Sequence, residues 1–338
     1  MKKNSFSLIS LFAGCGGLDL GFRGRFESHG KRYPGNPFSV IWANDFDSNA
    51  CKSYEGYFGH PIVCGDIREI LNGSNTDRPI PTSADVVLGG FPCQDFSHAG
   101  KRKGLEGTRG QLYLSMIEVI KRTKPLVFVA ENVKGLLTMN GGTVMDIITS
   151  DFEKIGYHVN AKLLLSADYG VPQMRERVII IGTRKKNLPL TFLKRNPHAT
   201  QGALPKFEID DYPSPTHTSD TWVTLGSALG DLEDVAEGEF ANHFWSKAKK
   251  NKGQGNNAVS RIKPGPTMRT EHHGNIEFHW NEKRRLSARE AARIQSFPDD
   301  FVFLPSTSAA YKQIGNAVPP VMAWHIARAL AQFLKRNL

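Results

Sequence analysis

The stretch GGFPCQDFS, residues 89–97, presents a cysteine in a turn whose composition is unlike that of a packed core. Cys93 follows a proline, and the chain continues into the basic run HAGKRKG. Nearby positive charge and amide donors favour the thiolate, which is the nucleophilic form of cysteine. Most free cysteines are instead small buried hydrophobes, and we expect this of Cys15, Cys51 and Cys64. Cys93 is therefore the candidate nucleophile.

A carboxyl group and two guanidinium groups could act together with this thiol. Glu131 stands in ENV at the end of an apolar run, while Arg175 and Arg177 in QMRERVIIIG are two residues apart and so share one face of a strand. A thiolate that adds to carbon 6 of cytosine makes carbon 5 a nucleophile toward an electrophilic methyl group, and a carboxyl that shares a proton with ring nitrogen 3 assists the addition. The arginines could clamp the base carbonyl, the carboxylate or a phosphate. A strand-end cap and surface ion pairs are the alternatives.

A glycine turn and two acidic strand ends suggest a nucleoside-binding site. FAGCGG, residues 12–17, lacks the G-x-G-x-x-G spacing of turns that bind a dinucleotide pyrophosphate, which favours a cofactor without phosphates. Asp45 in WANDFD could bind ribose hydroxyls, and Asp66 in CGDI could accept from an adenine amino group. The side chains that could pack on the ring are Phe12, Phe46 and Ile67. A tight turn with helix-capping carboxylates explains the same residues equally well.

Alternating strands and helices position these groups. Apolar runs predict strands at residues 5–12, 38–44, 84–90 and 125–132. Between them the sequence is helix-compatible in LDLGFRGRFESHG, in DSNACKSYEGYF with Asp47 as N-cap, and in GQLYLSMIEVIKRT. AKLLLSADYGVP and RVIIIGT are expected to add an antiparallel extension to the sheet. The fold class is therefore α/β, a Rossmann-like doubly wound sheet whose ligands lie beyond the carboxyl ends of the strands.

Composition changes after residue 184. Residues 185–285 are rich in Pro, Gly, Asn, Thr, His and Lys and lack clear periodicity, which predicts a smaller, loop-rich domain. Ser287 and Glu290 predict a capping box. The stretch GNAVPPVMAWHIARALAQFL predicts a final amphipathic helix with two prolines near its first turn.

Charge and cysteine usage limit the class of protein. The 338 residues include 43 Lys and Arg against 33 Asp and Glu, a net charge of +10 that favours a polyanionic partner such as nucleic acid. No run reaches the roughly 18 apolar residues that span a bilayer, and no cleavage site follows the short apolar start. Four cysteines without a C-x-x-C pair give no zinc signature and no disulfide framework. We expect a cytoplasmic protein that holds no metal.

Eight stretches occur in an order that resembles the DNA (cytosine-5)-methyltransferases, in particular the short bacterial enzymes of type II restriction-modification systems. They are FAGCGG, WANDFD, GDI, GGFPCQDFSHAGKRKG, ENVKGL, QMRERVIIIG, RRLSAREAARIQSFPDDF and QIGNAVPP. The resemblance implies an S-adenosyl-L-methionine-dependent enzyme that flips a cytosine out of duplex DNA. It implies that Cys93 is the nucleophile, Glu131 the partner of nitrogen 3, and Arg175 and Arg177 the active-site arginine pair. The implied cofactor contacts are Phe12, Gly14, Gly16, Asp45, Phe46, Asp66, Pro92, Leu112, Asn316 and Val318.

The same resemblance implies where the duplex binds. The loop from about residue 92 to 110 would close over the flipped base, with Gln94 and Ser97 near the duplex and Arg109 near a phosphate. Sequence recognition would lie in residues 185–285, where the predicted base readers are Arg269, His272 and His273. We expect a monomer that acts on double-stranded DNA away from membranes and protects host DNA beside a cognate restriction endonuclease. The expected divisions are a catalytic domain at 1–184, a target-recognition domain at 185–285, a motif helix and hinge at 286–308, and a segment at 309–338 that returns to the catalytic domain.

Three other functions would use some of these residues. A tRNA cytosine-5 methyltransferase would share the chemistry, but the long basic region before RRLSAREAARIQ is better suited to duplex DNA. A catalytically silent DNA-binding protein would have no use for Cys93, Glu131 and the arginine pair. A nicotinamide oxidoreductase would use the glycine turn and leave the cysteine segment unexplained.

Overall fold

The structure is a computed structural model that describes most of the chain. The described residues are 5–73, 77–92, 111–184, 194–195, 207–208, 212–249, 255–269, 276–281 and 283–337. The predictions for Cys93, Gln94, Ser97, Arg109, His272 and His273 lie outside them.

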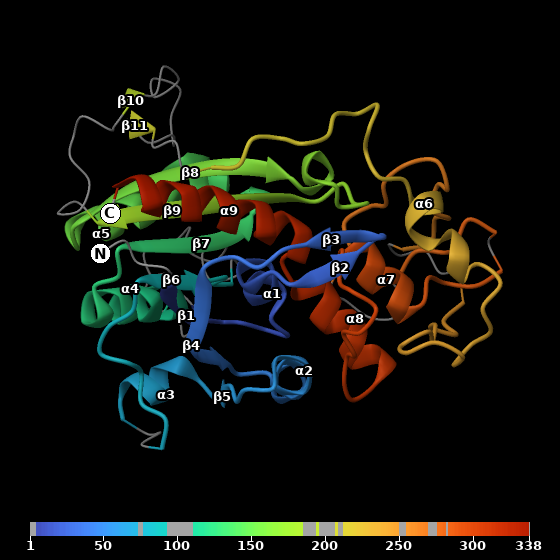
Figure 1. Cartoon of the computed structure of the whole chain (residues 1–338), viewed down its shortest axis with the longest axis horizontal. Coiled ribbons are helices and arrows are strands. Elements are labelled where there is room, and N and C mark those ends of the chain that lie inside the picture. The colour runs from blue at the N-terminus through green and yellow to red at the C-terminus, as the bar shows by residue number, and fades with distance from the viewer. Residues whose placement is uncertain are drawn as a thin grey trace.

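A seven-stranded sheet forms the centre of the fold (Figure 1). Its order is β5 (Val63–Cys64), β4 (Phe38–Asp45), β1 (Phe6–Leu11), β6 (Val86–Gly89), β7 (Val127–Val133), β9 (Glu176–Arg184) and β8 (Tyr157–Leu165). The first five strands pair in parallel, whereas β9 is antiparallel to both β7 and β8. The predicted parallel sheet with an antiparallel extension is confirmed.

Helices cover both faces of this sheet because successive side chains of each strand point to opposite sides. In β1, Leu8 packs into the cluster that holds α1 (Gly17–Arg23) and α9 (Pro320–Asn337). The next residue, Ile9, packs into the cluster that holds α3 (Ile67–Leu71), α4 (Gln111–Thr123) and α5 (Thr143–Lys154). Short 3-10 turns connect the elements at Lys134–Leu137, Met139–Gly142 and Ser166–Tyr169. The doubly wound α/β class is thus confirmed.

Two predicted helix starts are present with their caps. Asp47 accepts hydrogen bonds from the backbone N–H groups of Asn49 and Ala50 at the start of α2 (Ser48–Phe58). Ser287 and Glu290 form the predicted capping box of α7 (Ala288–Ile294). Both caps satisfy N–H groups that a helix start leaves without partners.

The structure differs from the helical prediction for LDLGFRGRFESHG. Helix α1 ends at Arg23, and Gly24 adopts a backbone conformation that glycine alone tolerates (φ 65°, ψ −154°). The chain then forms a hairpin of β2 (Phe26–Ser28) and β3 (Lys31–Tyr33), whose two turn residues both have positive φ, as a type I′ turn requires. The helical prediction failed because Gly24 permits a sharp reversal of the chain.

The second half contains mostly short elements. They are β10 (Lys194–Arg195), β11 (Phe207–Glu208), α6 (Leu225–Leu229), a 3-10 turn at Gly230–Leu232 and α8 (Thr307–Asn316). The predicted final helix takes in GNAVPP, but in the structure α8 ends at Asn316 and α9 begins at Pro320, so residues 317–319 interrupt the helix. A residue before proline, here Val318, is driven out of the helical region. Apolar residues of this half, including Leu225, Val259 and Met268, join the hydrophobic cluster on the α1–α9 face. No helix among the described residues is long and apolar enough to cross a membrane.

Candidate active site

The predicted catalytic and cofactor residues gather at the carboxyl ends of the parallel strands. Phe12 follows β1, Asp45 ends β4, Pro92 lies shortly after β6, and Glu131 stands near the end of β7. Figure 1 shows this edge of the sheet turned toward α7 and α8. Parallel strands bring their carboxyl ends to one edge, so residues far apart in sequence share one site.

Glu131 and Arg177 form an ion pair at this edge. Nε of Arg177 lies 2.7 Å from Oε1 of Glu131, and the two side chains are 12% and 11% exposed. A Cβ placed on Gly90 would lie 3.2 Å from Oε2 of Glu131, so the carboxylate rests against the backbone three residues before Cys93. This position brings the predicted general acid to the base of the segment that carries the predicted nucleophile.

Asn132 anchors the same backbone and is not among the residues predicted from the sequence. Its Nδ2 donates to the carbonyl oxygen of Phe91 at 2.9 Å, and both residues are buried. Glu131 and Asn132, adjacent on β7, therefore lie beside Gly90 and Phe91, the two residues that follow β6. The sequence did contain a sign of this role, because Glu131 and Asn132 are two polar residues at the end of a buried strand. A strand-end cap accounted for the pair, and the sequence indicated no specific partner for Asn132.

We expect Asn132→Ala to lower kcat by about tenfold to a hundredfold, since loosening a catalytic segment by about 1 Å can have effects of that size. The substitution also leaves the Phe91 carbonyl without its donor, which costs about 1–3 kcal/mol of stability. Transfer of tritium from labelled S-adenosylmethionine to DNA and thermal unfolding measure the two effects. Asn36→Ala is the matched control, because Nδ2 of Asn36 donates to the Gly21 carbonyl far from this edge. Equal kcat losses in both variants would show that Asn132 acts only on stability.

Arg175 and Arg177 have different hydrogen-bond partners in the structure. Strand β9 begins at Glu176, so Arg175 precedes the strand that the sequence assigned to it. Its Nη1 donates to the Met268 carbonyl at 3.0 Å, and its Nη2 donates to the carbonyls of Gly315 and Ala317 at 2.9 and 3.0 Å. Backbone carbonyls from distant segments bind the Arg175 guanidinium, while Arg177 pairs with Glu131. The charges of Arg177 and Glu131 still act on Arg175, so the three groups lie near one another, and the joint role of the two arginines stays a prediction.

A buried carboxylate organises the glycine turn. Oδ2 of Asp45 accepts from the Gly14 N–H at 2.7 Å, and Oδ1 accepts from the Asp47 N–H at 2.8 Å. Burial raises the pKa of Asp45. Among the described residues no atom lies within 4 Å of the position that a Cβ on Gly14 would take, and the neighbouring Phe46 ring is 71% exposed. An open turn, a carboxylate and an uncovered aromatic ring fit the ribose and base of an adenosyl group.

The connection between α8 and α9 closes the turn from the other side. A Cβ on Gly17 would lie 2.4 Å from the Val318 carbonyl oxygen, so the first turn of α1 touches the segment that contains the predicted contacts Asn316 and Val318. Asn316 is exposed, whereas Val318 is buried. A Cβ on Gly16 would lie 2.3 Å from Cε2 of Phe58, which shows that this glycine is needed for packing.

Asp66 has a structural partner that the sequence did not indicate. Its carboxylate caps α3 by accepting from the Arg68 N–H at 2.9 Å and forms an ion pair with the Arg68 guanidinium. Arg68 lowers the pKa of Asp66. The helix-cap alternative therefore describes what the structure shows, and the adenine contact stays a prediction. The remaining predicted contacts are the buried Ile67, the half-buried Phe12 and Leu112, and the exposed Pro92.

Asp19 is a buried acid in the first turn of α1, directly after the glycine turn. Burial raises its pKa to about 6, although the hydroxyls of Ser10 and Tyr54 and the charge of Arg23 lower it in part. Between about pH 4 and pH 6 the carboxyl of the unfolded chain is ionised while the folded protein still holds the proton. The contribution of Asp19 to the free energy of unfolding therefore falls as the pH rises through that window. Above pH 6 the full cost of ionising the buried carboxyl is present.

We expect Asp19→Asn to stabilise the protein above pH 6 by up to about 3 kcal/mol, because the variant never ionises the buried group. The gain over the wild type should grow by more than about 1 kcal/mol between pH 5 and pH 7.5 in urea unfolding. Asp47→Asn is the control. Burial acts to raise the pKa of Asp47, but Lys312 and the backbone N–H groups of Asn49 and Ala50 lower it overall. The stability that Asp47→Asn loses should therefore be the same at pH 5 and at pH 7.5. A gain at Asp19 that does not depend on pH would contradict the assignment.

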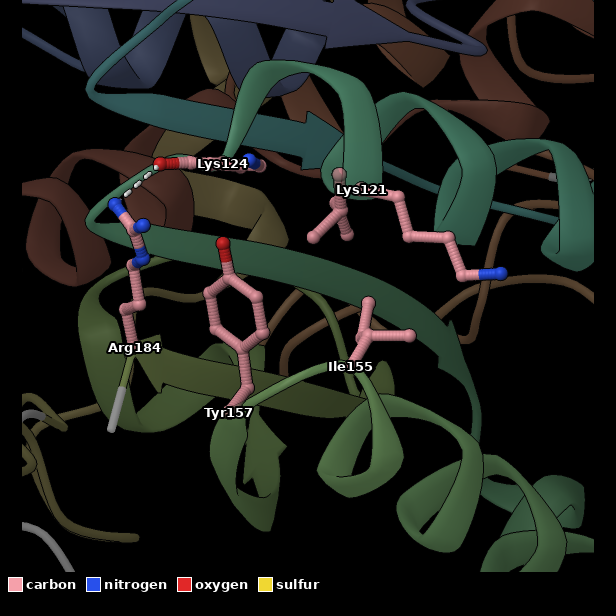
Figure 2. A pocket seen from close by; sticks show the side chains of 6 residues that line it. Lys121, Lys124, Ile155, Tyr157 and Arg184 are labelled. Carbon is pink, nitrogen blue, oxygen red and sulfur yellow. Dashed lines mark hydrogen bonds between the residues drawn. The ribbon is translucent and has the colours of Figure 1, made fainter. Parts of the chain in front are cut away.

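A cavity of about 300 Å³ lies at the opposite edge of the sheet (Figure 2). Three of its lining residues, Lys124, Tyr157 and Arg184, stand at the amino end of β7, at the start of β8 and at the end of β9. Figure 2 shows the Arg184 guanidinium turned to the Lys124 carbonyl, to which it donates at 3.2 Å, and the Lys121 side chain extending away. Because Lys124 precedes Glu131 by seven residues of mostly extended chain, roughly 23 Å, this cavity is separate from the candidate active site.

Among the predicted DNA-contacting residues the structure describes Arg269, which is exposed. Lys247 forms an ion pair with Glu237, and its Nζ lies 4.8 Å from the Trp245 ring centroid. The base-reading role of Arg269 stays a prediction.

Comparisons with known proteins agree with these sequence motifs. A family model described as C-5 cytosine-specific DNA methylase matches residues 6–332. The chain is 36% identical to the type II methyltransferase M.NgoFVII of Neisseria gonorrhoeae, over 99% of this chain and 89% of that protein. It is 35% identical to the type II methyltransferase M.BspRI of Lysinibacillus sphaericus, over 98% of this chain and 83% of that protein. The crystal structure of DNMT2 from Spodoptera frugiperda is similar in fold, with a TM-score of 0.64 and 17% identity over 96% of this chain and 99% of that one.

Proposed function

The chain belongs to the C-5 cytosine-specific DNA methylase family, and on that premise we propose that it methylates carbon 5 of one cytosine within a specific sequence of duplex DNA. The observation that carries the proposal is the Glu131–Arg177 ion pair, held against the backbone that leads to Cys93. A buried acid and a nucleophile on neighbouring strand ends suit attack on a base that has left the duplex.

The proposed reaction uses each group at a named atom. The Cys93 thiolate adds to carbon 6 of the flipped cytosine, and Glu131 supports the charge and proton at nitrogen 3. Arg177 holds the Glu131 carboxylate through Oε1, and Oε2 lies on the side of Gly90. After carbon 5 has gained the methyl group it loses its proton, and elimination of the thiolate restores the double bond of the ring.

S-adenosyl-L-methionine would supply the electrophilic methyl group. Asp45 and the Gly14 turn would hold the ribose, the exposed Phe46 ring would cover a face of the adenine, and the segment of Asn316 and Val318 would complete the pocket. The glycine turn lacks the spacing for a pyrophosphate, and this agrees with a cofactor that carries none.

We propose duplex DNA as the polymer and a protective role in a restriction-modification system. The two relatives above are type II methyltransferases, and the net charge of +10 suits a phosphate backbone. A tRNA substrate and a catalytically silent role are not favoured, because the matching family model describes a DNA methylase and Glu131 and Arg177 remain paired. We further propose that the enzyme acts as a cytoplasmic monomer beside a cognate endonuclease.

Bisulfite sequencing of total DNA tests this function. The chain is expressed in a host without its own 5-methylcytosine, and the same host expressing Cys93→Ala provides the background. We expect unconverted cytosines at one short sequence motif, and only in DNA from cells that express the wild-type chain. Complete conversion of DNA with protected cytosines in tRNA would overturn the choice of polymer, and complete conversion of both would overturn the activity.

A further inference from the structure

Arg175 is one of the most deeply buried charged side chains among the described residues. It is 1% exposed, and its three hydrogen bonds go to backbone carbonyls of two segments that lie 93 and about 140 residues further along the chain. A planar guanidinium can reach separate acceptors at once because its five donors point in fixed directions. The side chain thus links three parts of the sequence at one point.

Two buried glutamines bind the same two segments. Oε1 of Gln173 accepts from the Met268 N–H at 2.9 Å, and Nε2 of Gln295 donates to the carbonyls of Ile314 and Ala317 at 2.7 and 2.9 Å. Gln173 also donates to the side-chain oxygen of Gln295. We call Gln173, Arg175 and Gln295 the carbonyl junction. Arginine offers five donors, and glutamine offers two donors and an acceptor oxygen, so the network fixes the register of its backbone partners.

Each segment at the junction leads directly to one part of the proposed site. Met268 precedes the exposed Arg269, which is predicted to read a base. Gly315 and Ala317 flank Asn316, and the next residue, Val318, touches the glycine turn through its carbonyl. Arg177, two residues after Arg175, holds Glu131. The predicted base reader and the predicted cofactor contacts therefore lie, in the chain, next to residues that bind Arg175. Arg177, which holds the catalytic carboxylate, is two residues from Arg175 itself.

The placement of Arg175 is costly, which argues against a passive role. A buried cation without a bonded carboxylate forgoes hydration, and here its hydrogen bonds go to backbone carbonyls. Burial, followed by the charge of Arg177, lowers the pKa of Arg175 well below its ordinary value, while Glu131 acts in the other direction. The three hydrogen bonds engage both terminal nitrogens, while Nε is buried without a hydrogen-bond partner among the described residues.

We propose that Arg175 is a positioning residue, which couples target recognition and cofactor binding to the catalytic pair by holding the segments of Met268 and Gly315–Ala317 in register with Arg177. It does not contact the cytosine. The inference rests on the proposed function and goes beyond it, because it assigns one residue to the coupling of three sites.

The test compares Arg175→Met and Arg175→Lys with Arg177→Met in the full chain. We expect Arg175→Met to weaken S-adenosylmethionine binding in calorimetry by about tenfold or more and to reduce the ratio of cognate to one-mismatch methylation by about tenfold, as expected when supporting residues are lost. Arg175→Lys should lie between Met and the wild type, since one ammonium cannot span all three carbonyls. Arg177→Met should lose kcat by about a hundredfold or more with cofactor affinity and mismatch ratio kept.

Gln295→Met supplies a variant that dissects the junction. It removes donors to Ile314 and Ala317 and leaves the bonds of Met268 to Gln173 and Arg175, so we expect weaker cofactor binding with the mismatch ratio kept. If Arg175→Met does not fold, Arg175→Lys and Gln295→Met carry the test. The inference would be overturned by an Arg175 variant that loses kcat alone, which is the result expected for Arg177→Met. It would also be overturned by an Arg175 variant whose affinity for S-adenosylmethionine and mismatch ratio equal those of the wild type. If the wild-type chain methylates no DNA, the proposed function is refuted. If Arg175 variants of that chain still bind S-adenosylmethionine more weakly than the wild type, the part of the inference that concerns cofactor binding stands.

Discussion

Replacing Cys93 with alanine is expected to abolish methyl transfer while duplex DNA binding survives. The variant removes the atom that adds to carbon 6, and no other group in the proposed site can activate carbon 5. Loss of a covalent nucleophile lowers turnover by at least about 10⁴-fold in comparable enzymes. The proposed DNA contacts come from other residues, so we expect fluorescence anisotropy with a labelled cognate duplex to give an affinity close to that of the wild type.

Cys64→Ala is the matched control for this experiment. Cys15 and Cys51 are buried as predicted, but the prediction was wrong for Cys64, which is exposed. No role in the reaction is assigned to Cys64. Its substitution should leave methyl transfer within about twofold of the wild type, as is usual for surface positions. Residual turnover of Cys93→Ala above about one per cent of the wild-type rate would contradict nucleophilic catalysis by this thiol.

Glu131→Gln is expected to lower kcat by about 10²- to 10⁴-fold, the range associated with loss of general acid–base assistance. Glutamine keeps the shape that rests against Gly90, but it cannot share a proton with nitrogen 3 and it removes the ion pair with Arg177. Single-turnover methylation at saturating DNA and cofactor isolates this effect from binding. The affinity for S-adenosylmethionine should be unchanged, because Asp45 and the glycine turn are intact.

Glu176→Gln is the control for the carboxylate. Glu176 forms an exposed ion pair with Lys134 on the same strand as Arg177, at 2.8 Å. An exposed pair contributes little, so this variant should retain the wild-type rate within about twofold. Equal losses in the two glutamine variants would indicate a general electrostatic effect of the strand in place of a specific role for Glu131.

The strand ends were predictable from sequence because local patterns determine them. Apolar runs followed by Asp45 and Glu131 give both the strand and the polar group after it, and a parallel sheet brings such ends together. The capping box of Ser287 and Glu290 likewise depends on residues three apart. These features needed no knowledge of distant contacts.

The partners of Arg175 and Asp66 could not be predicted in the same way. Spacing alone made Arg175 equivalent to Arg177, yet its acceptors are carbonyls of residues that come together only in the folded chain. Asp66 satisfied the pattern of a ligand-binding strand end, and a neighbouring arginine took both its oxygens. Side-chain type and spacing place a group at an edge, but tertiary contacts decide what it binds.

Trapping the covalent intermediate tests the central claim most directly. A duplex that carries 5-fluorocytosine at the target position, found by bisulfite sequencing, is incubated with the protein and S-adenosylmethionine and analysed by mass spectrometry. Fluorine at carbon 5 cannot leave as a proton does, so the account predicts a stable adduct that has gained the methyl group and maps to Cys93. An active preparation that yields no adduct, or one joined through another residue, would contradict it.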